Sequence, residues 1–239
     1  MGVTTGKMAF QPNIVTNGLV LNLDAINPNS YPQSGTIWYD TSGNNNNGTL
    51  TNGTAWIPNG SQTSFSFDGV DDLVNCGNTT SILSITNQLT FGGFVKFNTF
   101  GTFRRFIFKD NGTEGVFESF YNPNVSKFDF ELVTSSGRTS VRSTTTPSIN
   151  TIYYLIGTYD GLNIKIYVNG VLENTVSKTG NISIGPGGGL FLGNTNGGAN
   201  PYSFYLNGNI YSTQIYNRAL SADEVSQNYN ALKTRFGLS

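Results

Sequence analysis

Histidine is absent from this chain, and other side chains with reactive chemistry are scarce. Without histidine the chain has no Ser–His or Cys–His nucleophile pair, none of the usual zinc sites and no imidazole for acid–base catalysis. Cys76 is the only cysteine, so no intramolecular disulfide can form, and we expect a small buried residue beside a strand. Function classes that depend on imidazole or on paired thiols are therefore excluded.

Charge is low as well, because only 11% of the residues are charged and the formal net charge is −1. Such a surface does not attract nucleic acid or anionic lipid, so we expect neither as a partner. No apolar run approaches the roughly 18 residues of a membrane span, which predicts no membrane insertion. The opening MGVTTGKMAFQPN lacks the apolar core of a secretory signal, so we expect synthesis in the cytoplasm without secretion.

The chain is instead rich in Asn, Thr, Ser, Gly and aromatic residues, a composition typical of all-β folds with many polar turns. Residues 151–175 show this best. Apolar residues alternate over 152–158 and over 164–168, and the turn dipeptides Asp160-Gly161 and Asn169-Gly170 follow. A three-strand meander of this kind needs a second sheet to cover one face. The pattern therefore predicts a β-sandwich.

Further strands are predicted on both sides of this meander. The two glycines of Leu89–Phe97 leave room for a close neighbour or a bulge. In 127–134 the apolar residues face the core, so Asp129 and Glu131 face outward or into a concave groove. Over 205–216, strict alternation places Ile210, Ser212 and Gln214 on one face.

One helix is predicted near the end of the chain. Ser221 and Glu224 form a capping box, and an apolar stripe at Val225, Tyr229 and Leu232 follows. The whole pattern predicts an all-β fold, a two-sheet antiparallel jelly-roll sandwich with one short C-terminal helix.

Four motifs, in order, resemble the laminin-G-like jelly rolls of the concanavalin A-like lectin/glucanase superfamily. They are W-Y-D-T-S-G-N at 38–44, F-D-G-V-D-D at 67–72, Y-Y-L-I-G-T-Y-D-G with Y-V-N-G over 153–170, and N-R-A-L-S-A-D-E-V at 217–225. The resemblance covers about residues 18–232. It implies the fold, but this fold hosts lectins, hydrolases and inert structural modules alike.

The motif series predicts one jelly-roll domain over 18–239, preceded by an N-terminal arm over 1–17. The arm is nearly uncharged and holds Phe10, Ile14 and Val15 among its apolar residues. Such a segment cannot build a core, but it can add contacts to a neighbouring subunit. We therefore expect a homo-oligomer or repeated subunit that is anchored through this arm.

Asp68, Asp71 and Asp72 place three carboxylates within five residues, with a glycine for the bend. Calcium prefers such clustered oxygen ligands, and the resemblance implies a calcium site at the rim of the sandwich. An aspartate in a tight turn also hydrogen-bonds its own backbone, so a plain turn remains the alternative.

A sugar-binding surface needs aromatic rings to stack on, together with side chains that offer several hydrogen bonds. Arg104, Tyr121, Asn122, Tyr202 and Tyr205 are the predicted members of such a surface.

A glycoside hydrolase or other polysaccharide-active enzyme is the alternative of the same fold. It requires two carboxylates about 5–10 Å apart on a concave face. The candidates are Glu118 and the pair Asp129 and Glu131, although solvated outward carboxylates explain these residues better. No compact Glu-x-Asp-x-Glu motif is present, so we expect no enzyme.

The stretch PNIVTNGLVLNLDAINPNSYP at 12–32 and the 38–44 motif also resemble laminin-G-like proteins of tailed bacteriophages. That resemblance implies a non-enzymatic virion surface protein: a capsid decoration, head fibre or tail appendage, attached to other virion proteins and able to bind cell-surface glycans. A capsid cement protein without a ligand is the second alternative.

Overall fold

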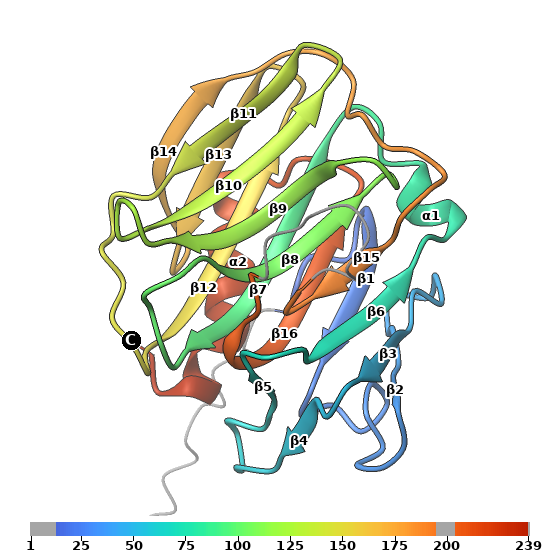
Figure 1. Ribbon diagram of the computed structural model, residues 1–239, viewed down its shortest axis with the longest axis vertical. Helices are drawn as coiled ribbons and strands as arrows, with labels where there is room; N and C mark the ends of the chain where they lie inside the picture. Colours follow the sequence, from blue (N-terminus) through green and yellow to red (C-terminus); the bar gives the residue numbers. More distant parts are fainter. Residues whose placement is uncertain (1–12, 195–203, 239) are drawn as a thin grey trace, which may run out of the picture.

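The fold was determined from a computed structural model, which describes residues 13–194 and 204–238. Two eight-stranded antiparallel sheets, here called sheet A and sheet B, stack face to face. Figure 1 shows sheet B in front, sheet A behind it and helix α2 behind sheet A. The predicted two-sheet sandwich with one short C-terminal helix is therefore confirmed.

Sheet A holds the predicted meander at one edge. Its strands in spatial order are β14 (Val171–Ser177), β13 (Asn163–Val168), β12 (Ile152–Tyr159), β7 (Leu89–Phe97), β16 (Asn207–Tyr216), β5 (Ser64–Asp68) and β4 (Ala55–Ile57), and β1 (Leu19–Asp24) also pairs with β16. Asn169 and Gly170, with φ of 51° and 81°, form the predicted tight turn between β13 and β14.

Sheet B is built mostly from the middle of the chain. Its strands in spatial order are β11 (Gly137–Arg142), β10 (Lys127–Thr134), β9 (Gly115–Asn122), β8 (Arg104–Asp110), β15 (Leu190–Leu192), β6 (Leu73–Gly77), β3 (Gly48–Thr51) and β2 (Ile37–Trp38). The short strands β2, β3 and β4, the short helix α1 (Thr80–Leu83) and the final 3₁₀ turn η1 (Lys233–Phe236) were not predicted from the sequence.

The main core lies between the two sheets and includes Phe128, Phe130 and Leu132, as predicted for β10. The two glycines of β7 allow the neighbouring strands to approach closely. A Cβ at Gly92 would lie 1.9 Å from the Leu155 carbonyl oxygen, and one at Gly93 would lie 2.0 Å from that of Ser212. Any larger residue at either position would force β12 or β16 away.

Helix α2 (Ala222–Leu232) covers the outer face of sheet A. Its capping box is present, because Ser221 accepts from the Glu224 amide and Glu224 accepts from the Ser221 amide. Val225 and Tyr229 pack into a second apolar cluster on this face, with Leu232 against it, as the apolar stripe predicted. None of the helices in the described residues is long and apolar enough to cross a membrane.

Strand β16 departs from the predicted alternation. A β-bulge between Ile210 and Ser212 shifts its register against β7. Ile210 and Ile215 therefore both face the main core, although they are five residues apart, and Tyr211 packs on the outer side. The prediction that Ile210 and Gln214 share a face is wrong, because the bulge inserts one residue and reverses the faces beyond it.

Residues 13–17 are attached to their own domain. The Val15 amide donates to Asn228 Oδ1 at 2.7 Å, and the Val15 carbonyl accepts from the Tyr216 hydroxyl at 2.9 Å. Val15 itself is buried in the outer cluster of sheet A. The part of the predicted arm from residue 13 onward is thus anchored to helix α2 and β16, and residues 1–12 lie outside the described residues.

Candidate functional site

The acidic turn between β5 and β6 is shaped by backbone hydrogen bonds to its own carboxylates. Asp68 Oδ1 accepts from the Val70 amide at 2.7 Å, and Asp72 Oδ2 accepts from the Asp68 amide at 2.8 Å. Gly69 supplies the bend with a φ of 83°, a conformation that favours glycine. The turn therefore holds Asp68, Asp71 and Asp72 together, and their nearest carboxylate oxygens lie within 4.8 Å of one another.

This spacing fits a calcium ion, because oxygens bound to one such ion at 2.3–2.6 Å lie within about 5 Å of each other. Asp72 is 4% exposed, and its Oδ1 atom has no hydrogen-bond partner among the described residues. Burial raises the pKa of the Asp72 carboxyl, and the charges of Asp68 and Asp71 act in the same direction. A bound cation would relieve both effects, so the donor set fits the predicted metal.

Two asparagines that sequence reasoning missed brace this turn. Asn52 Nδ2 donates to the Asp71 carbonyl at 3.1 Å, and Asn207 Nδ2 donates to the Asp68 carbonyl at 2.8 Å. Both lie far from the turn in the sequence. Only the pairing of β5 with β16 brings Asn207 opposite Asp68, so no local pattern could have indicated it.

Arg104 and Tyr205 join the acidic turn at the same rim of the sandwich. Arg104 Nη1 donates to the Tyr205 carbonyl at 2.9 Å, and a Cβ at Gly69 would lie 3.3 Å from that same Nη1. Burial lowers the pKa of Arg104, and its Nε is buried without a hydrogen-bond partner among the described residues. We call Asp68, Asp71, Asp72, Arg104 and Tyr205 the rim site.

The other residues predicted for a sugar-binding surface lie elsewhere. Tyr121 is 5% exposed and belongs to the main core, and its ring stacks on the half-buried Phe100 at a centroid distance of 4.0 Å. This placement removes Tyr121 from the predicted surface, because a ring enclosed in the core offers no face to a sugar. Asn122 lies at the end of β9, where it donates to Asp129 at 2.8 Å. Tyr202 lies outside the described residues.

The candidate catalytic carboxylates occupy the outer face of sheet B. Glu118 pairs with Arg105, which is fully buried, at 2.7 Å. Glu131 accepts from Arg138 and from Ser140. Burial raises the pKa of the Glu118 carboxyl, and the neighbouring Glu131 also raises it. The charge of Arg105 opposes both effects by lowering the pKa of Glu118. Both groups are thus held by cationic or hydroxyl partners.

Asp129, the third of these carboxylates, is 2% exposed. Arg142 binds it through two hydrogen bonds of 2.8 and 2.9 Å. The prediction that Asp129 and Glu131 face away from the core is confirmed. Cys76 is a buried residue of β6, as predicted, and burial raises the pKa of its thiol to about 12.

Solved structures share this architecture at low sequence identity. A Trypanosoma rangeli sialidase mutant that displays trans-sialidase activity matches with a TM-score of 0.66 and 15% identity, over 93% of this chain and 34% of that chain. The binding domain of botulinum neurotoxin DC, solved in complex with SialylT, matches with a TM-score of 0.66 and 15% identity, over 91% of this chain and 52% of that chain.

The binding domain of Paraclostridial Mosquitocidal Protein 1 matches with a TM-score of 0.65 and 14% identity, over 90% of this chain and 52% of that chain. This chain therefore spans between about a third and about half of the length of these three solved chains. At such identities the likeness establishes the fold alone.

No curated protein matches the chain in sequence. A laminin G-type family model, described as the concanavalin A-like lectin/glucanases superfamily, matches residues 67–226. The strands before residue 67 belong to the same two sheets, because β1 pairs with β16 and β3 pairs with β6. With more than half of its length matched, this chain belongs to the concanavalin A-like lectin/glucanase superfamily.

Proposed function

We propose that this protein is a non-enzymatic glycan-binding module that takes its ligand at the rim site. The observation that carries the proposal is the convergence of three separate segments: the acidic turn, Arg104 at the start of β8, and Tyr205 before β16. Two buried polar atoms of this site, Asp72 Oδ1 and Arg104 Nε, have no hydrogen-bond partner among the described residues. Polar groups of this kind favour a ligand that supplies their missing hydrogen bonds.

Calcium would be held at this site by Asp68, Asp71 and Asp72, where it would supply a positive charge that attracts sugar hydroxyl and carboxylate oxygens. Arg104 has donors in a planar arrangement that suits a carboxylate or a pair of hydroxyls. Two of the structural neighbours are connected with sialyl chemistry: one is a sialidase mutant that displays trans-sialidase activity, and the other is a toxin binding domain solved in complex with SialylT. Sialylated glycans are therefore the first class to test.

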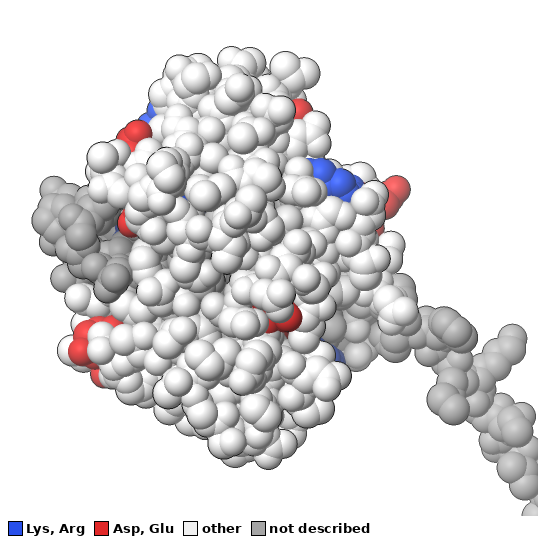
Figure 2. All heavy atoms as spheres, turned by 90° about the vertical axis from the view of Figure 1, so that its right-hand side faces the viewer, with Lys and Arg blue, Asp and Glu red and all other residues white. Residues whose placement is uncertain are grey.

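The proposal extends to a virion, where the module would serve as a repeated surface subunit: a capsid decoration, head fibre or tail appendage. The resemblance of residues 12–32 and of the 38–44 motif to laminin-G-like phage proteins supports this role. The small share of charged residues in the chain supports it as well. The side of the molecule that carries β3, β6 and α1 shows few charged side chains (Figure 2). A neutral, amide-rich surface of this kind limits non-specific adhesion of an exposed particle.

A glycan microarray, run with millimolar calcium and again with chelator, tests the rim site. The full chain should bind with calcium. Both Asp72→Asn and Arg104→Ala should lose binding while they stay folded, with melting temperatures in chelator close to that of the unaltered chain. Asp223→Asn, in the first turn of helix α2, is the matched control and should bind normally. Equal binding by Asp72→Asn and Arg104→Ala would overturn the site, and absence of binding by the unaltered chain would favour a ligand-free cement protein.

A second candidate function, polysaccharide hydrolysis, is favoured by one observation. Glu118 and Glu131 lie directly opposite each other on neighbouring strands, and the pKa of Glu118 is raised by burial. Turnover of a polysaccharide panel that disappears in both Glu118→Gln and Glu131→Gln would establish it. Absence of turnover by the unaltered chain would count against hydrolysis.

Attachment to a particle is tested by deletion of residues 1–12, a boundary that spares the hydrogen bonds of Val15. The shortened chain should keep its melting temperature and fail to join particles or oligomers. Normal assembly of the shortened chain would show that the anchor lies on the sandwich itself.

A further inference from the structure

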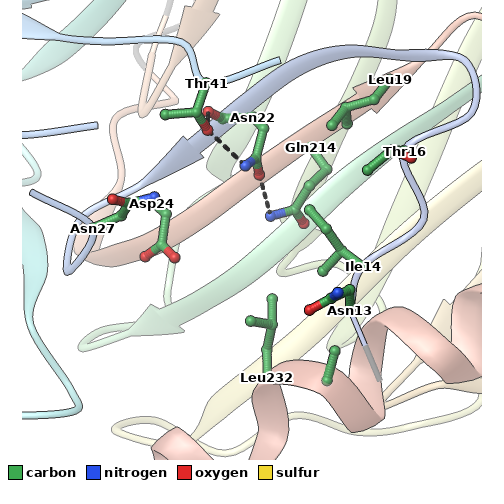
Figure 3. Close-up of a pocket in the computed structure, with 11 residues that line it drawn as sticks. Asn13, Ile14, Thr16, Leu19, Asn22, Asp24, Asn27, Thr41, Gln214 and Leu232 are labelled. Atoms are coloured by element: carbon green, nitrogen blue, oxygen red, sulfur yellow. Dashed lines mark hydrogen bonds between the residues drawn. The ribbon is translucent and has the colours of Figure 1, made fainter. Parts of the chain in front are cut away.

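A pocket of about 520 Å³ lies on the outer face of sheet A, away from the charged face of sheet B. Its floor is formed by β1 and β16, one wall by residues 13–16 and the other by the end of helix α2 (Figure 3). Pockets that bind small ligands commonly have volumes of roughly 300–1,000 Å³. The space is therefore large enough for a small organic molecule.

The floor is a row of uncharged hydrogen-bonding side chains, as Figure 3 shows. Asn22 Nδ2 donates to Thr41 Oγ1 at 2.8 Å, and Gln214 Nε2 donates to Asn22 Oδ1 at 3.2 Å. Gln214 is 2% exposed, and its Oε1 has no hydrogen-bond partner among the described residues. A buried amide oxygen without a donor is costly, so the site favours a ligand that brings a hydroxyl. We call this region the amide pocket.

The walls are aliphatic. Ile14 and Leu19 lie on the side of the N-terminal segment, and Leu232 faces them from helix α2. The wall formed by the N-terminal segment is tied to helix α2, because Gln227 Nε2 donates to the Asn13 carbonyl at 2.8 Å. A ligand that matches this lining carries C–H surface on its sides and hydroxyl groups toward the floor.

The amide pocket offers no free charge. Asp24 is its one titratable lining residue among those described, and both of its carboxylate oxygens bind Arg235 at 2.8 Å. An anionic ligand would meet Asp24, and a cation would compete with Arg235, so both are disfavoured. The chemistry of the lining therefore selects an uncharged ligand.

We infer that the amide pocket binds the ring of a neutral sugar, independently of calcium. Aliphatic side chains take the place that aromatic rings hold in the sugar-binding surface predicted from the sequence. A pyranose ring matches this lining, because it has C–H groups on its faces, hydroxyl groups around its edge and no charge. The inference does not rest on the rim site, because the two sites share no residue. A module with both sites could hold one glycan type with calcium and a second without it.

The probe is a panel of methyl glycosides of neutral hexoses, titrated in chelator against the full chain and followed by saturation-transfer NMR and calorimetry. Ile14→Trp fills the pocket from its wall and should abolish binding. Gln214→Met removes the unpartnered oxygen with little change in volume and should weaken binding roughly tenfold, the loss of about one hydrogen bond. Leu162→Trp, in the exposed turn before β13, is the matched control and should bind normally.

A methyl glucuronide should bind more weakly than its neutral counterpart, because the pocket has no free cation. Failure of every neutral glycoside to bind, or unchanged binding by Ile14→Trp, would overturn the inference. Loss of monosaccharide binding in Asp72→Asn would also overturn it and would assign the binding to the rim site. Retention in Asp72→Asn together with loss in Ile14→Trp would support the amide pocket whatever the outcome of the microarray.

Discussion

The outer faces of the two sheets differ in composition and in what covers them. On sheet A, helix α2 and η1 bury an apolar cluster that includes Phe94, Tyr154 and Phe236. On sheet B, the equivalent face carries charged residues that pair across neighbouring strands, such as Asp129 with Arg142. One face is thus stabilised by removal of apolar area from water, and the other by ion pairs in register.

This difference separates the two candidate binding regions. The covered face leaves only the uncharged amide pocket at the margin of the helix, where amide groups lie between aliphatic walls. The rim site lies where β5 of sheet A meets β8 of sheet B, and it collects carboxylates and a guanidinium. A sandwich can therefore offer two ligand chemistries when only one of its faces is covered.

Phe94→Ala should have the largest effect on stability. Phe94 is fully buried beneath the helix and lies 4.6 Å from the Tyr154 ring and 4.5 Å from the Phe236 ring. Its truncation should lower the free energy of unfolding by about 3–5 kcal/mol, measured by chemical denaturation. Leu172→Ala, at an exposed position on β14, is the control and should change it by less than about 0.5 kcal/mol. Similar losses in both variants would show that the helix does not seal this face.

Glu118→Gln tests the charged face. Arg105 is fully buried against Glu118, so a neutral partner removes the largest charge that compensates the guanidinium, and the free energy of unfolding should fall by about 3 kcal/mol. Glu114→Gln is the matched control, because its contact with Arg138 is exposed on both sides and should contribute about 0–1 kcal/mol. An unchanged free energy of unfolding in Glu118→Gln would mean that burial of apolar area, and not ion pairing, stabilises this face too.

Calcium should stabilise the rim in a pH-dependent way. The folded pKa of Asp72 is raised, so without metal its contribution to stability is present at low pH and is lost as the pH rises above the usual aspartate range. Calcium should restore it, with a rise in melting temperature of roughly 5 °C at pH 7, or about 2 kcal/mol. The rise should shrink toward pH 4, because protons compete for Asp72. An equal rise in Asp72→Asn at pH 7 would place the metal elsewhere.

Glu224→Gln should have the smallest effect, at the attachment of helix α2. Hydrogen bonds from Arg218 lower the pKa of Glu224 to about 2. The stability that Glu224 contributes is thus present above the usual glutamate pKa and is lost as the pH falls toward 2. At pH 7 the variant should lose about 1 kcal/mol, a typical value for a helix cap, and the difference should vanish near pH 2. The free energy of unfolding is measured by chemical denaturation at both pH values. If Glu224→Gln is still less stable than the unaltered chain at pH 2, the loss has a steric cause and not an electrostatic one.

The sequence predicted the features that depend on neighbouring residues. The Asn169-Gly170 turn, the capping box at Ser221 and the bend at Gly69 follow from backbone preferences and short hydrogen bonds, and all are present. The alternation in β10 likewise placed Asp129 on the outer face. Each of these patterns lies within one element, so its physics is complete without the rest of the chain.

The positions of Tyr121 and Val15 were decided by long-range packing. Tyr121 was predicted at the surface, but its strand turns that face toward Phe100 and the core. Val15 was predicted in an arm that contacts a neighbouring subunit, and it docks instead on Asn228 and Tyr216 of its own chain, which are more than 200 residues away. No local pattern encodes either contact.

The sequence by itself determined the family, the two-sheet fold, the C-terminal helix and the acidic turn, because each of these is specified by short-range pattern. Only the tertiary structure decided which residues meet at the two candidate sites. Strand pairing brought Asn207 to the acidic turn, and the bulge after Ile210 turned Gln214 outward onto the floor of the amide pocket. Register in a sheet depends on contacts between distant strands, and a shift of one residue reverses every face that follows it.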